Sequence, residues 1–470
     1  MTRRGPTLVL IGLGAFVTTL DNTIVAAGAP SIARDLALDL GALQWVALGY
    51  MLPFAGLLLV AGTLVDRWGR RATLLAGLLA FGAGAVVGGL AGSVGLLVAA
   101  RVLQGAAAAF LVPGLLSLLS LLRTNLDARG RTLGAAVWTA CLAAALALGP
   151  ALGGLLSAVL GWSWIFFVNL PFVAAMLGLL PSSAPPGRKP DGPRPPAAAM
   201  AVVTASLVLL TAALVELGGD PRTGGTLLAA GTLLGAGFAV RERRTRARLV
   251  PAELTGNRVF AGSLAVQLLW GLGVSGVFFF TPLVHQEFLG LGPVGAGLPL
   301  VLVAVAVLAA TPFVPGAVAA FGPPRTVAAG LAVVAGGLLA LAAVNHLPAV
   351  GPRVPGMVLI GAGSAFTVPL TSHALDVVAE RQSGTASGLL TASRELSSAL
   401  GVALIGAVLT AVRALRLEAG APAGVALAGG YTAGLLAAAG LTLGGALLAV
   451  RVLRTPAATT SSPGDKRAVP

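Results

Sequence analysis

The sequence predicts an all-α integral membrane protein whose fourteen transmembrane helices are arranged as six, two and six. Three observations predict this class. Hydrophobic residues make up 57% of the 470 residues and charged residues only 10%, against about a quarter charged in soluble proteins. Apolar segments of about 20 residues, the length that crosses a bilayer, recur along the whole chain. Basic residues gather in alternate loops, as expected of a multi-pass membrane protein.

The first six predicted spans end at a proline-rich segment. Residues 182–197 hold six prolines and little apolar sequence, which is typical of a flexible linker. We therefore predict a first bundle over 1–181. Its spans are expected at 7–29, 43–65, 72–91, 94–122, 132–155 and 162–181.

Two further spans and a second bundle follow. Spans 198–217 and 223–241, with the linker and the polar segment 241–258, form the predicted middle region 182–258. The second bundle is predicted over 259–451 and a polar tail over 452–470. Its spans are expected at 259–284, 294–318, 325–345, 355–377, 385–411 and 428–451.

The basic residues are divided unequally between the two sides. With this division of spans, 23 of the 30 lysines and arginines fall on the side of the two termini, five on the other side, and two inside spans. The positive-inside rule then predicts cytoplasmic termini and a place in the cell membrane. The net charge of +14 is thereby explained by topology, so no nucleic-acid partner is expected. Membrane lipid is the expected surrounding partner.

The first span is expected to stay in the protein. A basic start and the small residues near Ala26 and Ala29 resemble a cleavable signal peptide. Cleavage would leave an odd number of spans and break the alternation of charge. We therefore expect span 7–29 to be the first helix of the bundle.

A weak internal repeat predicts two related halves. Residues 62–71 and 316–325 match after one deletion, and each segment follows the second span of its bundle. In transporters built from repeats, the substrate site lies near the membrane midplane between the halves.

Charges inside a bilayer are costly unless they are paired, and two of them lie at the same depth. At 1.5 Å per residue, Asp21 and Arg101 lie ~12 and ~10 Å from the same membrane face. They can meet if spans 7–29 and 94–122 are neighbours. A proton or a cationic substrate arriving at Asp21 would then compete with Arg101. The alternatives are a packing role for Asp21 and a bracing role for Arg101.

Three further polar residues extend this list of coupling candidates. Gln104 follows Arg101 by three residues and shares its helix face. Arg394 and Glu395 lie inside span 385–411 and, being adjacent, point about 100° apart. One of them is expected to face a cavity or another helix, and packing is an equal alternative. The three histidines, among them His285, are expected at helix ends where water solvates them.

The charged turn after the second span is a candidate conformational gate. Gly62, Asp66, Arg67, Gly69, Arg70 and Arg71 form it. Arginines alone would suffice as a membrane anchor. The added acid and the two glycines favour a latch between closely approaching helix ends.

A second glycine motif lies inside span 132–155. Gly149, Pro150, Gly153 and Gly154 belong to it. Proline removes a backbone donor and kinks the helix, while glycines permit close packing. The kink can be structural or part of the mechanism.

The sequence lacks the residues and motifs that several kinds of chemistry require. Cys141 is the only cysteine, so neither an intramolecular disulfide nor a zinc site of cysteine and histidine is expected. Lys189 and Lys466 precede Pro190 and Arg467, so no Walker A motif is present. No hydrolase motif is found either. We expect no enzyme activity, no metal and no cofactor.

Taken in order, these motifs resemble those of the major facilitator superfamily, specifically its fourteen-helix drug:proton antiporter family of actinobacterial antibiotic-resistance type. The resemblance rests on segments 20–30, 62–71, 101–105, 145–154 and 162–171. Ala26 stands where the family has asparagine, Ala145 replaces a glycine, and Ser163 replaces an arginine. The second half matches more loosely.

The resemblance implies alternating access between two six-helix bundles, with Asp21 and Arg101 lining the path and residues 66–71 gating it. The expected function is proton-coupled export of a hydrophobic or cationic small molecule, powered by the proton gradient, by a monomer. A dedicated exporter of an endogenous metabolite such as an amino acid, lipid or siderophore is the alternative. A membrane sensor without transport is a third possibility, disfavoured by the absence of a soluble signalling domain.

Overall fold

A computed structural model describes residues 4–124, 128–184, 197–245, 252–379 and 382–453, and within these ranges the secondary structure is entirely helical. The first helices are α1 (Arg4–Asp35), α2 (Leu40–Trp68), α3 (Arg70–Gly89), α4 (Val94–Thr124), α5 (Ala128–Val159), α6 (Trp164–Phe167) and α7 (Asn169–Ser183). The middle helices are α8 (Ala197–Leu217), α9 (Pro221–Arg244) and α10 (Ala252–Gly256). The remaining helices are α11 (Arg258–Glu287), α12 (Pro293–Ala310), η1 (Thr311–Phe313), α13 (Val314–Phe321), α14 (Pro323–Val344), η2 (Gly351–Arg353), α15 (Val354–Ala365), α16 (Pro369–Asp376), α17 (Ser383–Glu418) and α18 (Ala423–Val452).

Thirteen helical spans of the described residues are long and apolar enough to cross a membrane. The multi-pass membrane class predicted from composition is therefore confirmed. The remaining predicted span, 198–217, corresponds to α8, whose apolar stretch Ala201–Leu217 is shorter than the others. α8 still packs with the other helices, since it contacts α9, α2 and α17.

Three predicted spans are broken rather than continuous. Span 162–181 is divided into α6 and α7, span 294–318 ends in η1 and α13, and span 355–377 is divided into α15 and α16. Prolines near the starts of the later pieces, including Pro312 and Pro369, explain the breaks because proline cannot donate the helical hydrogen bond.

Two helices extend well beyond their predicted spans on the opposite side. α1 extends to Asp35 and α17 to Glu418, so Arg34, Arg413 and Arg416, predicted in loops, lie on helices.

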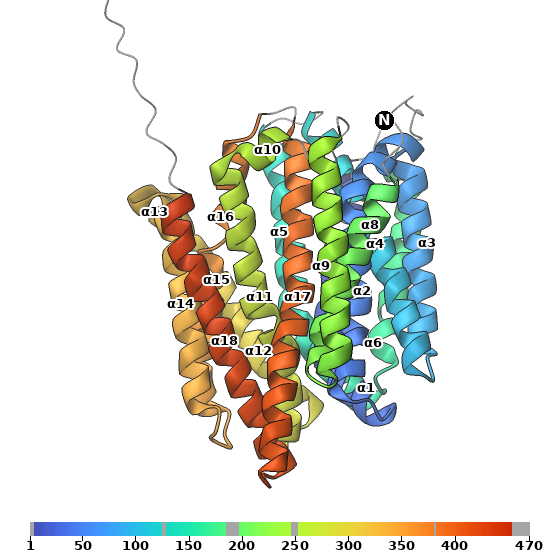
Figure 1. Cartoon of the computed structure of the whole chain (residues 1–470). Coiled ribbons are helices and arrows are strands. Elements are labelled where there is room, and N and C mark those ends of the chain that lie inside the picture. Colours follow the sequence, from blue (N-terminus) through green and yellow to red (C-terminus); the bar gives the residue numbers. More distant parts are fainter. Residues whose placement is uncertain (1–3, 125–127, 185–196, 246–251, 380–381, 454–470) are drawn as a thin grey trace, which may run out of the picture.

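The helices form two bundles with the same pairing order. In the first, α1 packs on α5, α2 and α3 pack on α4, and α3 packs on α7. In the second, α11 packs on α17, α12 and α14 pack on α15, and α14 packs on α18. α1 begins and α18 ends at one face of the molecule, at the top of Figure 1. We call this the terminal face and the other the opposite face.

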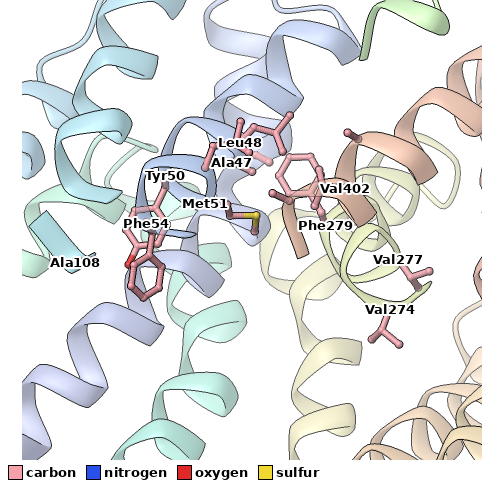
Figure 2. Close-up of a cluster of buried hydrophobic side chains, with 14 of the residues drawn as sticks. Ala47, Leu48, Tyr50, Met51, Phe54, Ala108, Val274, Val277, Phe279 and Val402 are labelled. Carbon is pink, nitrogen blue, oxygen red and sulfur yellow. The ribbon is translucent and has the colours of Figure 1, made fainter. Parts of the chain in front are cut away.

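The bundles meet along α2 with α17, α5 with α12, and α1 with α11. A buried apolar cluster crosses this boundary. In Figure 2, Leu48 and Met51 of α2 lie close to Phe279 of α11 and Val402 of α17. α9 makes its contacts with α8, which lines the seam between α2 and α17.

The two segments of the internal repeat form the same turn. Gly69 (φ 84°) and Gly322 (φ 78°) both adopt the left-handed region, which favours glycine. Each amide N–H donates to the carbonyl four residues earlier, at 3.0 and 2.9 Å. Thr73 and Thr326 then return a hydroxyl hydrogen bond to these glycine carbonyls, at 3.0 and 2.9 Å. The halves therefore share local geometry as well as helix order.

Candidate functional site

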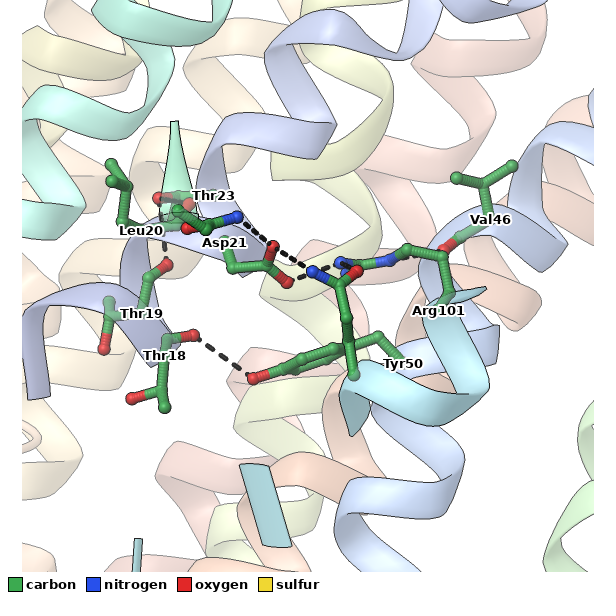
Figure 3. Close-up of polar contacts among 10 residues, drawn as sticks. Thr18, Thr19, Leu20, Asp21, Thr23, Val46, Tyr50 and Arg101 are labelled. Atoms are coloured by element: carbon green, nitrogen blue, oxygen red, sulfur yellow. Dashed lines mark hydrogen bonds and ion pairs between the residues drawn. The ribbon is translucent and has the colours of Figure 1, made fainter. Parts of the chain in front are cut away.

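The structure brings Asp21 of α1 and Arg101 of α4 into direct contact. Arg101 Nη1 donates to Asp21 Oδ2 at 2.5 Å, and both side chains are completely buried (Figure 3). An isolated charge in this environment would cost several kcal/mol. Each charge therefore needs the other as its partner. The pair lies inside the first bundle rather than in an open cavity.

Two amides complete the shell around the carboxylate. Asp21 Oδ1 accepts from Gln104 Nε2 at 3.0 Å and from Asn169 Nδ2 at 2.8 Å. Gln104 and Asn169 are also fully buried. Asp21 thus receives three donors from two helices, α4 and α7, and this arrangement suits a carboxylate that can only accept hydrogen bonds.

Arg101 has partners beyond Asp21. Its Nε donates to the Val46 carbonyl at 3.2 Å and its Nη1 to Gln104 Oε1 at 3.0 Å. The guanidinium carbon lies 4.5 Å from the centre of the Tyr50 ring, within the range of a cation–π interaction. Tyr50 O–H donates to the Thr18 carbonyl of α1 at 3.3 Å (Figure 3). The cation is therefore held by α2 as well as by α1.

Close helix packing makes this arrangement possible. Gly105 of α4 lies so near the Tyr50 backbone that a Cβ atom there would collide with the Tyr50 carbonyl. On the other side, a Cβ at Gly49 of α2 would lie 3.2 Å from Arg101 Cβ. Small residues therefore let α2 approach α4 closely, which places the Tyr50 ring against the guanidinium.

The predicted glycine motif of α5 faces two partners. Cβ atoms at Gly149 and Gly153 would meet Thr23 and Ile24 of α1. A Cβ at Gly154 would lie 2.6 Å from the Pro293 carbonyl of α12.

Pro150 of α5 also lies close to α12. Its carbonyl stands 2.6 Å from where a Cβ of Gly297, also on α12, would lie. α5 therefore links α1 to the second bundle near the opposite face.

The predicted gate is described in part. α2 ends at Trp68, Gly69 forms the turn, and α3 begins at Arg70. Arg70 and Arg71 are half-buried. The surroundings of Gly62 and the side chains of Asp66 and Arg67 are outside what the structure describes, so a latch made by them stays a prediction.

Arg394 and Glu395 contact each other rather than separate partners. Arg394 Nη2 lies 3.2 Å from Glu395 Oε1. The Arg394 side chain is 52% exposed and that of Glu395 only 9%. Both residues lie on α17, which packs against α2 of the first bundle.

Comparisons with known proteins identify the family to which the chain belongs. The family model of the Major Facilitator Superfamily matches residues 11–402. The chain belongs to the major facilitator superfamily. It is 33% identical over 464 residues to a puromycin resistance protein of Streptomyces alboniger, covering 95% of this chain and 91% of that one.

It is also 32% identical to a multidrug efflux pump of Mycolicibacterium smegmatis, covering 90% and 84%. An autoinhibited peptide transporter of the POT family shares the fold, with a TM-score of 0.71 at 15% identity over 96% and 98% of the two chains. The sequence-based assignment to this superfamily is confirmed, and the two relatives named here are a resistance protein and an efflux pump.

Two residues that contact the Asp21–Arg101 pair, Asn169 and Tyr50, were not predicted from the sequence. Asn169 lies in the family-like segment 162–171, but nothing in the segment indicates contact with Asp21. Tyr50 is one of only two tyrosines in the chain and lies in an otherwise apolar span, which was a usable signal. Both contacts depend on helices that are distant in sequence.

The expectation that water solvates the histidines at helix ends was wrong for two of them. His285 is fully buried and His373 is 8% exposed. Arg353 is also fully buried. Arg353 Nη2 donates to the carbonyls of Asn345 and Leu347. A ring nitrogen of His373 lies 2.9 Å from the Leu453 carbonyl. Neighbouring helix ends cover these side chains, which hydropathy along one helix does not reveal.

Proposed function

We propose that this chain is a proton-coupled antiporter that exports hydrophobic or cationic small molecules, including antibiotics, by alternating access. The observation that carries the proposal is the fully buried Asp21–Arg101 pair with its hydrogen-bonded shell. Relatives over most of the chain are a resistance protein and an efflux pump. An intramembrane ionisable pair is a default candidate for proton handling.

The geometry supplies a simple coupling step. A proton taken up by the Asp21 carboxylate removes its negative charge and weakens its bond to Arg101. Arg101 is not left isolated, because Val46, Gln104 and the Tyr50 ring still hold it. Protonation therefore changes the attraction between α1 and α4 without expelling the arginine. The energy source is the proton gradient, and no cofactor is required.

The substrate region is proposed to lie between the bundles near Arg394 and Glu395. Arg394 lies about 16 Å along the helix axis from the start of α17 at Ser383. A half-exposed arginine facing lipid inside the span would cost several kcal/mol. We infer that it faces a hydrated region, with the buried Glu395 beside it to attract a cationic substrate.

The terminal face is proposed to be cytoplasmic, in the cell membrane, because arginines concentrate there. Arg241, Arg243 and Arg244 lie on the last turn of α9 at that face, where anionic lipid headgroups can bind. We further propose that the transporter acts as a monomer and catalyses no reaction. A dedicated metabolite exporter would use the same residues and differ only in substrate.

The test is efflux of cationic dyes and antibiotics in inside-out membrane vesicles, with the movement of protons recorded at the same time. We expect substrate-triggered proton release from the wild type and none from Asp21→Asn. Asp39→Asn is the matched control. Asp39 caps α2 at an exposed position, and asparagine caps equally well. Coupled transport that survives Asp21→Asn would refute the proposal.

A further inference from the structure

Asn169 is placed against Asp21 by a helix break. α6 ends at Phe167 and α7 begins at Asn169, so the amide stands at the first residue of a helix inside the bundle. Its Nδ2 donates to Asp21 Oδ1 at 2.8 Å. Its Oδ1 is buried and has no hydrogen-bond partner among the residues that the structure describes. A buried acceptor without a partner is unusual enough to require an explanation.

The ionised and protonated forms of Asp21 need different neighbours. The carboxylate accepts from Arg101, Gln104 and Asn169, all of them donors. A protonated carboxyl becomes a donor through its new O–H and needs an acceptor, since a buried donor without a hydrogen bond is destabilising.

Asn169 is the neighbour that can supply this acceptor. Arg101 has none. Gln104 Oε1 already accepts from Arg101 Nη1 at 3.0 Å, and turning that amide would point its NH₂ group at a guanidinium. The Asn169 oxygen is occupied by no such bond.

We propose that Asn169 is a positioning residue that hydrogen-bonds Asp21 in both protonation states by turning its side-chain amide. With Asp21 ionised, Nδ2–H donates to Oδ1. When a proton forms an O–H bond at Asp21, the amide turns and its oxygen accepts that O–H. Loss of the proton reverses both changes. No covalent bond other than the O–H forms or breaks.

The surroundings of Asp21 leave this role to Asn169. Among the described residues, the other charged or titratable groups nearest to it are Arg101 of α4 and Tyr50 of α2, and Glu395 lies on α17, which packs against α2. Tyr50 O–H already donates to the Thr18 carbonyl. The inference rests on the proposed proton site at Asp21, and not on which substrate is exported.

The test is infrared difference spectroscopy of the purified full-length protein between neutral and acidic buffer. Asp21→Asn identifies the protonated carboxyl band by its loss. In Asn169→Leu, which offers neither donor nor acceptor, we expect that band to move to higher wavenumber because the O–H has lost its acceptor. In Gln104→Leu, which removes a donor to the same oxygen, we expect it to stay in place.

The outcomes separate this inference from the proposed function. A band that does not move in Asn169→Leu, or that moves equally in Gln104→Leu, overturns the amide switch even when dye efflux is proton-coupled. The expected shift in a protein that transports none of the dyes supports the switch and counts against the proposed substrate class. Thermal unfolding of each variant shows whether the bundle is still folded, and Asn169→Ser repeats the comparison with a side chain that can both donate and accept.

Discussion

At the scale of single residues, Arg101 has more partners than an ion pair needs. It contacts a carboxylate, a backbone carbonyl, an amide oxygen and an aromatic face. A cation held this way keeps favourable contacts when the carboxylate is neutralised. Tyr50 is central to this, since it supplies the ring to Arg101 and an O–H to α1.

Tyr50 offers a test that separates these two contacts. Tyr50→Phe keeps the ring against the guanidinium and loses one hydrogen bond, so the free energy of unfolding is expected to fall by about 1 kcal/mol. Tyr50→Leu also loses the cation–π contact, worth about 2 kcal/mol when desolvated, so a larger loss and weaker transport are expected. Denaturation curves and dye efflux measure both. Equal effects of the two substitutions would exclude a role for the aromatic face.

At the scale of elements, glycines set the distances between helices. Gly105 lets α2 approach α4, and the glycines of α5 let α1 and α12 approach from two sides. Because α1 carries Asp21 and α12 belongs to the second bundle, α5 is a physical link between the proposed proton site and the bundle boundary.

Gly154→Ala is expected to weaken that link. The new Cβ would lie 2.6 Å from the Pro293 carbonyl, and backbone cannot give way as a flexible side chain does. We expect the opposite face to open more often and transport to fall several-fold. The measurement is thiol labelling of a cysteine introduced at Leu427 in a Cys141→Ser background. Leu427 lines a cleft at the opposite face, beside Arg34 and Glu287. Gly178→Ala is the control, because no atom lies within 4 Å of its added Cβ. Unchanged labelling in Gly154→Ala would contradict the expectation.

At the scale of the whole molecule, the two bundles touch near the opposite face. Arg34 of α1 and Glu287 of α11 form an ion pair at 3.6 Å. Both line a cleft of about 370 Å³ together with Asp39 and Arg413. The Gly154 contact with α12 lies on the same side. The ion pair and the Gly154 contact therefore join the two bundles at the opposite face.

Charge reversal at this pair tests the closure. Arg34→Glu is expected to favour opening and to change transport only a few-fold, because an exposed ion pair contributes about 0.2–1 kcal/mol. Glu287→Arg should act in the same direction, and the double variant should restore the wild-type rate. Vesicle efflux at low and high salt provides the measurement. A double variant no better than either single one would show that the pair does not join the bundles.

The sequence by itself determined the membrane class, the family and the depth of the charged residues. Hydropathy and loop charge are local properties, and depth follows from the rise per residue. For that reason Asp21 and Arg101 could be expected to meet before any helix was placed. The repeated turn at Gly69 and Gly322 could also be recognised in the sequence, because a position that needs a positive φ is usually occupied by glycine.

Only the tertiary structure decided which other side chains complete the site. Asn169 reaches Asp21, Tyr50 lies against Arg101, and His285 and Arg353 are buried. Each of these facts depends on which helices are neighbours and how each is rotated about its axis. Hydrophobic periodicity constrains neither when lipid and protein interiors are equally apolar. Contacts between helices far apart in the chain therefore had to be read from their packing.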